Sequence, residues 1–222
     1  MIKSRKGASA GNTRQNSRER ILRLSILSLF SALILLMAFT PLGYLKTVGV
    51  EISFLMVPVA AGAALLGPIG GLILGTLFGI TSLIQAASGL SIFGFTLFGI
   101  NPICTVLVCL IPRMLMGLFS GLIAKAFAKS EKESISTGVR SVVTCLSAPL
   151  FNTIMFMGLL ILFFWNTEYI QSMAGGLKIL PFVIAFVGIN GLLEVAASLV
   201  VGTAASVALI KVCKSMTGKN IL

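Results

Sequence analysis

Four polar residues interrupt three apolar stretches in the second half of this sequence. Arg113 and Asn152 lie in two separate stretches, and Asn190 and Glu194 lie together in a third. If these stretches cross a membrane, each polar group is costly unless it is paired or solvated. An arginine there can neutralise an anion, and an asparagine can both donate and accept hydrogen bonds. The four residues are therefore the first candidates for a binding site.

The position of these residues along their helices predicts that they share one layer. Arg113 is roughly 17 Å from the outer end of its stretch, and Glu194 is roughly 22 Å from that of its own. In one interpretation Arg113 and Glu194 form a pair that fixes helix packing, and the two asparagines bridge neighbouring helices. In the other, the layer is the floor of a ligand cavity in which Arg113 faces an anionic or polar group.

Several residue types that common catalytic sites need are missing. The sequence has no Asp and no His, and its six acidic residues are all Glu. Metal binding and most proton transfers rely on Asp or His. Gly218 and Lys219 have no upstream glycine pattern, so there is no nucleotide-binding P-loop. We therefore expect no enzymatic activity, no cofactor and no metal, and apolar packing roles for Cys104, Cys109, Cys145 and Cys213.

The apolar stretches place the chain in the membrane class. Of its 222 residues, 57% are hydrophobic and 10% are charged, and the mean hydropathy is +1.06. Because a span needs about 20 apolar residues, the sequence predicts an all-α integral membrane protein with six transmembrane helices. Gly67 and Pro68 leave almost no loop between the second and third helices, which predicts a helical hairpin. The predicted spans are Ile21–Phe39, Ile52–Leu66, Ile69–Ala86, Pro102–Ala128, Val142–Trp165 and Ile179–Ile210.

The net charge of +11 follows the predicted topology. Fourteen of the seventeen Lys and Arg residues fall in the N-terminal segment, the loop around residues 125–140 and the C-terminal segment. The positive-inside rule therefore places both termini in the cytoplasm of a multi-pass protein of the bacterial plasma membrane. Tyr44, Trp165 and Tyr169 then lie at the outer interface, where aromatic anchors belong. Since the charge has this topological cause, nucleic acid is not an expected partner.

The chain divides into three predicted segments. Residues 1–20 form a basic cytoplasmic tail that we expect to be disordered and to contact anionic membrane lipid. Residues 21–211 form the six-helix membrane domain, and residues 212–222 form a short cytoplasmic tail.

Small residues form stripes on three of the predicted helices. Gly117 and Gly121 lie one turn apart in the fourth helix, and Ser28 and Ala32 have the same spacing in the first. Such stripes let helix backbones approach closely. They predict packing within the bundle or a sliding contact with a partner membrane protein. The longest stripe, around the predicted hairpin, consists of Gly67, Gly71, Gly75 and Gly79.

Two predicted outer loops have an unusual composition. Residues 40–51 mix turn formers with Tyr44 and with charges of both signs, and residues 87–101 are apolar with three glycines and no charge. An apolar loop of this kind either folds over a ligand as a lid or dips back against the bundle. Tyr44, Gln85 and Asn101, which lie in or beside these loops, are further candidate substrate contacts.

Together these stretches resemble the substrate-binding S component of energy-coupling factor (ECF) transporters. The resemblance covers nearly the whole chain beyond residue 20 and includes the helix number and polarity. The stretches that carry it are Thr40-Pro41-Leu42-Gly43-Tyr44, Val57-Pro58-Val59 to Leu66-Gly67-Pro68, Phe78-Gly79-Ile80-Thr81-Ser82, Asn101-Pro102, Pro112-Arg113 with Gly117 and Gly121, Asn152-Thr153, and Asn190-Gly191 with Glu194.

The resemblance implies capture of a vitamin or related small molecule from outside, under the first and third loops. Such S components dock on a shared transmembrane T subunit that two cytoplasmic ATPases drive, and they topple in the membrane to deliver their load. Ser28 and Ala32 stand where the family has an Ala-xxx-Ala docking pair. The chain looks somewhat like pantothenate-type members, but Met56 stands where a His is expected before Val57-Pro58. Riboflavin, folate and other compounds therefore stay open as substrates.

A stand-alone secondary transporter of a small solute is the main alternative. It predicts acidic residues at mid-span, discontinuous helices and inverted repeats. Only Glu194 meets the first requirement, and we find no convincing repeat, so an S component is favoured. The candidate substrate contacts are Arg113, Asn152, Asn190, Glu194, Tyr44, Asn101 and Gln85.

Overall fold

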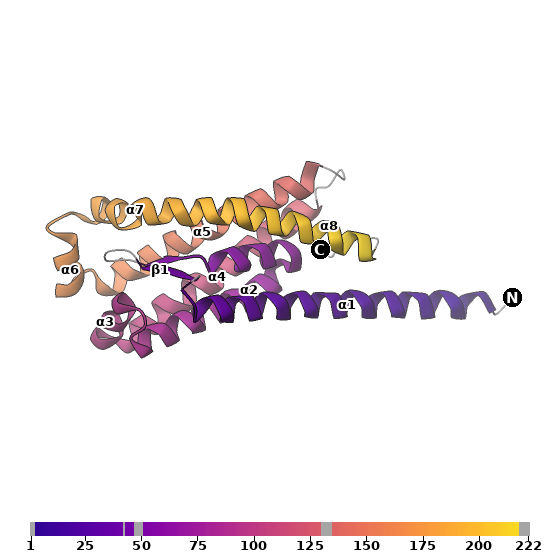
Figure 1. Cartoon of the computed structure of the whole chain (residues 1–222), viewed down its shortest axis with the longest axis horizontal. Coiled ribbons are helices and arrows are strands. Elements are labelled where there is room, and N and C mark those ends of the chain that lie inside the picture. Colours follow the sequence, from indigo (N-terminus) through magenta and orange to yellow (C-terminus); the bar gives the residue numbers. More distant parts are fainter. Residues whose placement is uncertain (1–2, 42, 47–50, 130–134, 218–222) are drawn as a thin grey trace.

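The computed structural model describes residues 3–41, 43–46, 51–129 and 135–217, most of them in helices that run along one long axis (Figure 1). A short antiparallel hairpin pairs Tyr44 with Ser53 and Lys46 with Glu51. The elements are α1 (Lys3–Ala38), β1 (Tyr44–Lys46), β2 (Glu51–Ser53), α2 (Met56–Ser88), α3 (Ile92–Ile100), α4 (Pro102–Lys129), α5 (Ile135–Phe164), α6 (Glu168–Ala174), α7 (Ile179–Ala197), the π-helical turn η1 (Ser198–Gly202) and α8 (Thr203–Thr217).

Most of the long helices have the length and apolarity of membrane spans. Within the described residues five qualify, and six do if α6 and the first part of α7, which meet at 77°, count as one span. This confirms the predicted class, an all-α integral membrane protein with several spans. One of the five, α2, has 33 residues, well beyond the roughly 20 that a span requires.

The excess length of α2 is taken up by a sharp reversal at Gly67. This residue has φ 74° and ψ −160°, a conformation that a residue with a Cβ rarely adopts. Pro68 follows, and its missing N–H is tolerated because a new helix starts there. A Cβ added to Gly71 would lie 3.0 Å from the Cβ of Ala63, although the two residues would be about 12 Å apart in a straight helix. The predicted hairpin is therefore confirmed, but its first helix begins at Met56, because Ile52 belongs to β2.

The second part of α2 packs on α4 through glycines, and we call this contact the glycine seam (Gly67, Gly71, Gly75 and Gly79 of α2 with Gly117 and Gly121 of α4). A Cβ on Gly117 would collide with the carbonyl oxygen of Gly71, and one on Gly75 would collide with that of Arg113. A Cβ on Gly121 would lie 2.6 Å from the carbonyl of Gly67. In lipid, where apolar burial does not drive helices together, such close packing supplies the association. These glycine stripes thus pack within the bundle.

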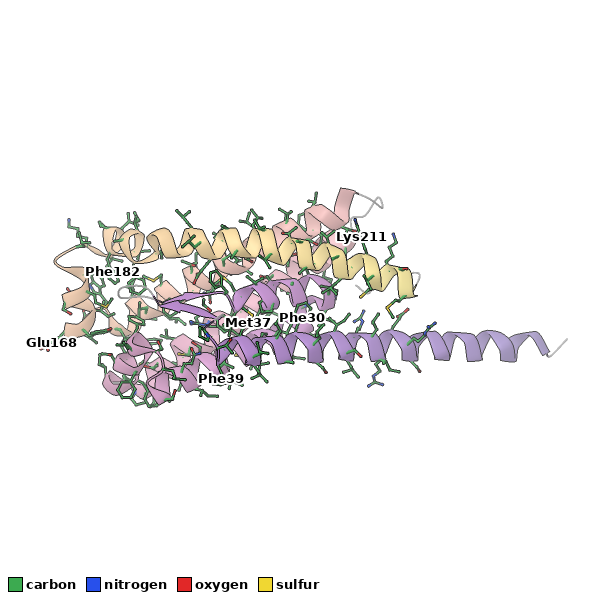
Figure 2. The ribbon with its side chains drawn as sticks, in the orientation of Figure 1. Phe30, Met37, Phe39, Glu168, Phe182 and Lys211 are labelled. Carbon is green, nitrogen blue, oxygen red and sulfur yellow. The ribbon has the colours of Figure 1, made fainter. Side chains whose placement is uncertain are left out.

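The face of α1 that packs on the bundle repeats every fourth residue. Every fourth side chain from Ile26 to Ala38 is buried, mainly against the first part of α2. Figure 2 shows Phe30 and Met37 on the side of α1 that faces α2, and Phe39 on the other side. Phe39 is 53% exposed, so the outward face of α1 is also apolar, as contact with lipid requires.

The two ends of the bundle differ in character. The start of α1, the junction of α4 with α5 and the end of α8 lie at one end, and α3 and α6 lie at the other (Figure 1). Lys211 lies toward the first end and Glu168 at the second (Figure 2). The basic segments therefore share one end, as the sequence predicts. That this end faces the cytoplasm remains a prediction of the positive-inside rule.

Two helix starts and one predicted loop differ from the sequence prediction. Hydropathy marks where lipid contact begins, whereas a helix continues as long as its backbone hydrogen bonds do. Accordingly α1 begins at Lys3, so most of the tail that was expected to be disordered is helical. Helix α5 begins at Ile135 rather than Val142. The apolar 87–101 segment contains α3, whose N-terminus Ser91 caps by accepting a hydrogen bond from Gly94 N.

The predicted sixth span, 179–210, is not one continuous helix. Helix α7 is kinked at Gly188, where φ is 24° and ψ is −126°, and η1 joins α7 to α8 with π-helical bonding. The stretch that meets the span criteria is Gly191–Met216. A π turn inserts an extra residue without breaking the run of apolar side chains, so hydropathy carries no sign of it.

The glycine seam predicts that one added methyl group separates α2 from α4. We expect Gly117→Ala to lower stability by about 1–3 kcal/mol, because the methyl must displace backbone atoms rather than a flexible side chain. Thermal unfolding in detergent measures the effect. Gly158→Ala is the matched control, since no atom lies within 4 Å of a Cβ at that mid-helix position. Equal melting temperatures for the two variants would show that the seam is looser than described.

Candidate functional site

A cavity of about 130 Å³ lies between α2, α3, α4, α5 and α7. Arg113, Asn152 and Glu194, three of the four residues of the predicted polar layer, line it. Ser53 of β2 also contributes to the wall. Elements far apart in the sequence therefore meet around one space, and the polar residues of three spans belong to a single site.

Arg113 is held on the cavity wall by aromatic rings. One Nη atom donates to the carbonyl oxygen of Val108 at 2.8 Å, and the guanidinium carbon lies 4.9 Å from the ring centroid of Phe156 and 5.5 Å from that of Phe78. Cation–π contacts of this kind stabilise a desolvated guanidinium by roughly 2 kcal/mol. Its Nε is buried without a hydrogen-bond partner among the described residues. A guanidinium has several further N–H donors, so its hydrogen-bonding capacity is only partly used.

Two amide side chains line the same cavity. Asn152 of α5 is 8% exposed, and its Oδ1 is buried with no hydrogen-bond partner in the described part of the chain. Gln85 of α2 is also buried, and its Nε2 donates to the carbonyl oxygen of Ala38. Gln85 thus ties the end of α1 to the cavity wall, whereas Asn152 keeps an acceptor unused.

Glu194 binds the hairpin that follows α1. Its Oε1 accepts a hydrogen bond from the backbone N–H of Ser53 at 2.9 Å. No ion pair joins Glu194 to Arg113 in the described residues, so the structure does not contain the predicted Arg113–Glu194 packing pair. The carboxylate instead fixes the edge strand β2 against α7, across a sequence separation of 141 residues.

Helix α3 forms one wall of the cavity. Phe93 and Leu97 line the space, and the Phe93 ring lies 5.5 Å from that of Phe186 of α7. A Cβ on Gly94 would lie 2.9 Å from the Cβ of Ala86, so α3 packs tightly back on α2. The apolar segment therefore dips back against the bundle, and its side chains also line the cavity. That it folds over a ligand as a lid remains a prediction.

The remaining predicted contacts are placed differently. Asn101 is exposed and does not line the cavity; its Oδ1 accepts from Cys104 N at 3.1 Å and caps the start of α4. Asn190 lies in α7, one turn before Glu194, and Tyr44 lies in β1, but the side chains of both fall outside the described residues.

Several residues that line the cavity were not among the predicted substrate contacts. Phe78 and Ser82 precede Gln85 by seven and three residues on one face of α2, and Thr105 and Cys109 precede Arg113 by eight and four on α4. Helical spacing from the polar candidates was the signal that could have found them. Small hydroxyl and thiol groups are also common in helix packing, so the spacing alone did not separate the two roles.

The predicted docking pair lies on the outer surface of α1. Ser28 and Ala32 are both exposed, on the face opposite the buried series that contains Phe30. Leu29 and Leu33 beside them are 59% and 41% exposed. The small stripe of α1 therefore faces away from the bundle, unlike the glycine seam.

Comparison with known proteins identifies the family to which this chain belongs. The family described as "ECF transporter, substrate-specific component" matches residues 22–204. No functionally curated protein matches the chain significantly. Within the described residues no group of three His, Cys, Asp or Glu side chains is arranged to hold a metal ion.

The Glu194 contact predicts that this carboxylate anchors the hairpin. We expect Glu194→Ala to speed hydrogen exchange at the Ser53 amide about tenfold or more, because removing the acceptor of a buried N–H costs about 1–3 kcal/mol. Glu194→Gln keeps an oxygen acceptor and should retain most of the protection. Hydrogen-exchange mass spectrometry of a peptide covering residues 51–55 makes the comparison. Exchange in the alanine variant as slow as in the wild-type protein would mean that other contacts hold β2 in place.

Proposed function

Because this chain belongs to the family of substrate-specific components of ECF transporters, we propose that its cavity captures a vitamin or related small molecule from outside the cell. The captured molecule then passes inward with the help of a transmembrane T subunit and two cytoplasmic ATPases. The observation that carries the proposal is a cavity among the spanning helices whose wall holds polar groups without partners. Such groups are costly inside a protein unless a ligand completes their hydrogen bonds.

We assign different roles to the residues of the wall. Arg113 and Asn152 contact the substrate directly, because their hydrogen-bonding capacity is incomplete. Gln85 and Glu194 shape the site by holding α1 and β2, and their remaining polar atoms are available to the substrate. Asn190 precedes Glu194 by four residues in α7, and Tyr44 pairs with Ser53 in the hairpin, so both remain proposed contacts.

Asn101 is better explained as a helix cap than as a substrate contact. Its carboxamide already accepts from the first turn of α4, and capping of this kind stabilises a helix end by about 1 kcal/mol. Its exposure also separates it from the cavity.

The size of the cavity favours a compact substrate. Its volume of about 130 Å³ is close to that of an engineered cavity, roughly 150 Å³, that holds a benzene ring. A molecule the size of folate therefore needs the hairpin or α3 to move. Smaller vitamins and related compounds fit with less rearrangement.

The exposed stripe of α1 supplies a docking face for the T subunit. Ser28 and Ala32 let another helix approach closely, and the neighbouring leucines add apolar contact area. The chain carries no P-loop, so ATP hydrolysis belongs to the partner subunits. The basic start of α1 contacts anionic lipid at the membrane surface.

A stand-alone secondary transporter is the second candidate, because α7 is discontinuous at Gly188 and at η1. Broken helices of this kind build the ion and substrate sites of many secondary transporters. Here, however, the one carboxylate at the cavity is engaged by Ser53 N. Uptake by vesicles that contain this chain alone, driven by an ion gradient, would support the secondary transporter; dependence on the T subunit and ATP supports the S component.

Capture predicts that a vitamin-type substrate raises the melting temperature of the purified protein. A ligand that binds only the folded state at 100 times its Kd adds about 2.7 kcal/mol of stability. Thermal unfolding in detergent with pantothenate, riboflavin, folate, thiamine and biotin measures this shift. Asn152→Leu is the control, because an apolar side chain of similar shape keeps the packing but cannot bond the substrate. A folded protein whose melting temperature no compound changes would contradict capture of this class.

Docking through α1 predicts that bulk on the stripe blocks transport without affecting capture. We expect Ser28→Leu and Ala32→Leu to bind substrate normally but to reduce uptake to background in cells that also make the T and ATPase subunits. Gly158→Leu adds the same bulk on an exposed face of α5 and should leave uptake intact. Normal uptake by both α1 variants would rule out this face as the docking site.

A further inference from the structure

We propose that the molecule captured in the cavity is a compact carboxylate that also carries a hydroxyl or amide N–H donor. This inference rests on the proposed function and specifies the substrate class of the same site. It follows from the charge and hydrogen-bonding groups that the cavity residues leave unmatched.

The first argument is the charge of Arg113. In the described part of the chain its one hydrogen bond goes to a neutral carbonyl, of Val108, and its guanidinium carbon lies over the rings of Phe78 and Phe156. Neither contact supplies a negative charge. A cation in the membrane-spanning region is costly unless an anion compensates it. A carboxylate is the group that matches a guanidinium in shape and charge, with two parallel hydrogen bonds.

The second argument is that Glu194, although near enough to Arg113 for an electrostatic attraction, does not pair with it by direct contact in the described residues. It lines the same cavity, but its Oε1 holds Ser53 N and no ion pair connects it to Arg113 in the described residues. A cationic substrate would use Glu194 and leave the guanidinium with a second positive charge nearby. The anionic substrate gives Arg113 its partner and leaves the anchor of the hairpin intact.

The third argument is the set of polar atoms without partners. Three buried side-chain atoms of cavity residues have no hydrogen-bond partner among the described residues: Arg113 Nε, Asn152 Oδ1 and Ser53 Oγ. Arg113 Nε can only donate a hydrogen bond, Asn152 Oδ1 can only accept one, and the Ser53 hydroxyl can do either. A substrate must therefore present an acceptor for Arg113 and a donor for Asn152. A carboxylate alone meets the first requirement but not the second.

The other side chains of the cavity wall determine the chemistry of the part of the substrate between its carboxylate and its donor. Leu97, Val108, Met157 and Val187 line the cavity together with aromatic rings, so the part between the carboxylate and the donor has an apolar face. The cavity volume of about 130 Å³ keeps this body small. The substrate class is therefore a short aliphatic or single-ring hydroxy- or amido-carboxylate.

Capture from a mixture tests the class without assuming a compound. The purified protein is incubated with the low-molecular-weight fraction of yeast extract, washed and denatured, and the released molecules are identified by mass spectrometry. A released carboxylate that carries a hydroxyl or amide N–H supports the proposal. A released compound without a carboxylate overturns it and leaves capture standing. Release of nothing from a folded sample overturns both this inference and the proposed function.

Paired ligands then test the role of the charge. The affinity of the released acid is compared with that of its primary alcohol or methyl ester. Two commercial pairs, pantothenate with pantothenol and biotin with biotin methyl ester, are measured in the same titration. For wild-type protein we expect the acid to bind about 100-fold more tightly, because a buried charge loses its partner in the neutral analogue. In Arg113→Gln the preference should disappear. Equal affinity of acid and neutral analogue in the wild-type protein overturns the proposal.

Two further variants separate recognition from folding. Arg113→Lys keeps the charge but not the paired hydrogen bonds, and it should retain part of the preference for the acid. Arg140→Gln alters a second buried arginine, in α5, which does not line the cavity, and it should leave the preference unchanged. Size-exclusion and thermal unfolding without ligand establish that each variant is folded. If Arg140→Gln lost the preference for the acid and Arg113→Gln kept it, the assignment of Arg113 as the carboxylate-binding residue would also be overturned.

Discussion

The close approach of α2 and α4 along the glycine seam determines where every other feature of the site can lie. A Cβ on Gly75 would collide with the carbonyl oxygen of Arg113, and one on Gly79 would lie 3.1 Å from that of Cys109, so the two backbones touch in this register. That register places the guanidinium 5.5 Å from the ring centroid of Phe78. In lipid, side-chain burial cannot hold helices together as it does in water, so backbone proximity supplies both the attraction and the alignment.

A second consequence of the seam is a division along the bundle. On one side of the cavity, α1 and the first part of α2 pack into a continuous apolar core, and Ser198 and Ser206 satisfy their hydroxyls by donating to backbone carbonyls at 2.7 and 2.6 Å. At the cavity, Arg113 and Asn152 keep atoms without partners. Buried polar atoms without partners also occur away from the cavity, at Ser141, Thr144 and Thr203 among the described residues. It is therefore the convergence of Arg113 and Asn152 on one space that supports the proposed binding site.

The hairpin and α3 are short elements that line the cavity. β2 has few contacts of its own, and the bond from Ser53 N to Glu194 fixes it to α7. Helix α3 is held by the close contact of Gly94 with Ala86. Both coverings are short elements with few backbone partners, and such elements open at lower free-energy cost than the long helices do. Of the elements that line the cavity, these two are therefore the least costly to open.

The sequence by itself determined the class, the approximate spans, the hairpin at Gly67 and three polar residues, Arg113, Asn152 and Glu194, that line one cavity. These are local properties, because lipid requires a long apolar stretch for each span and makes every interruption conspicuous. Tertiary structure alone decided that Glu194 binds Ser53 and not Arg113, that Asn101 caps α4, and that residues 92–100 form a helix over the cavity. Such choices depend on the rotation and register of packed helices, and a difference of one residue in register exchanges the partners of every polar group while leaving the hydropathy unchanged.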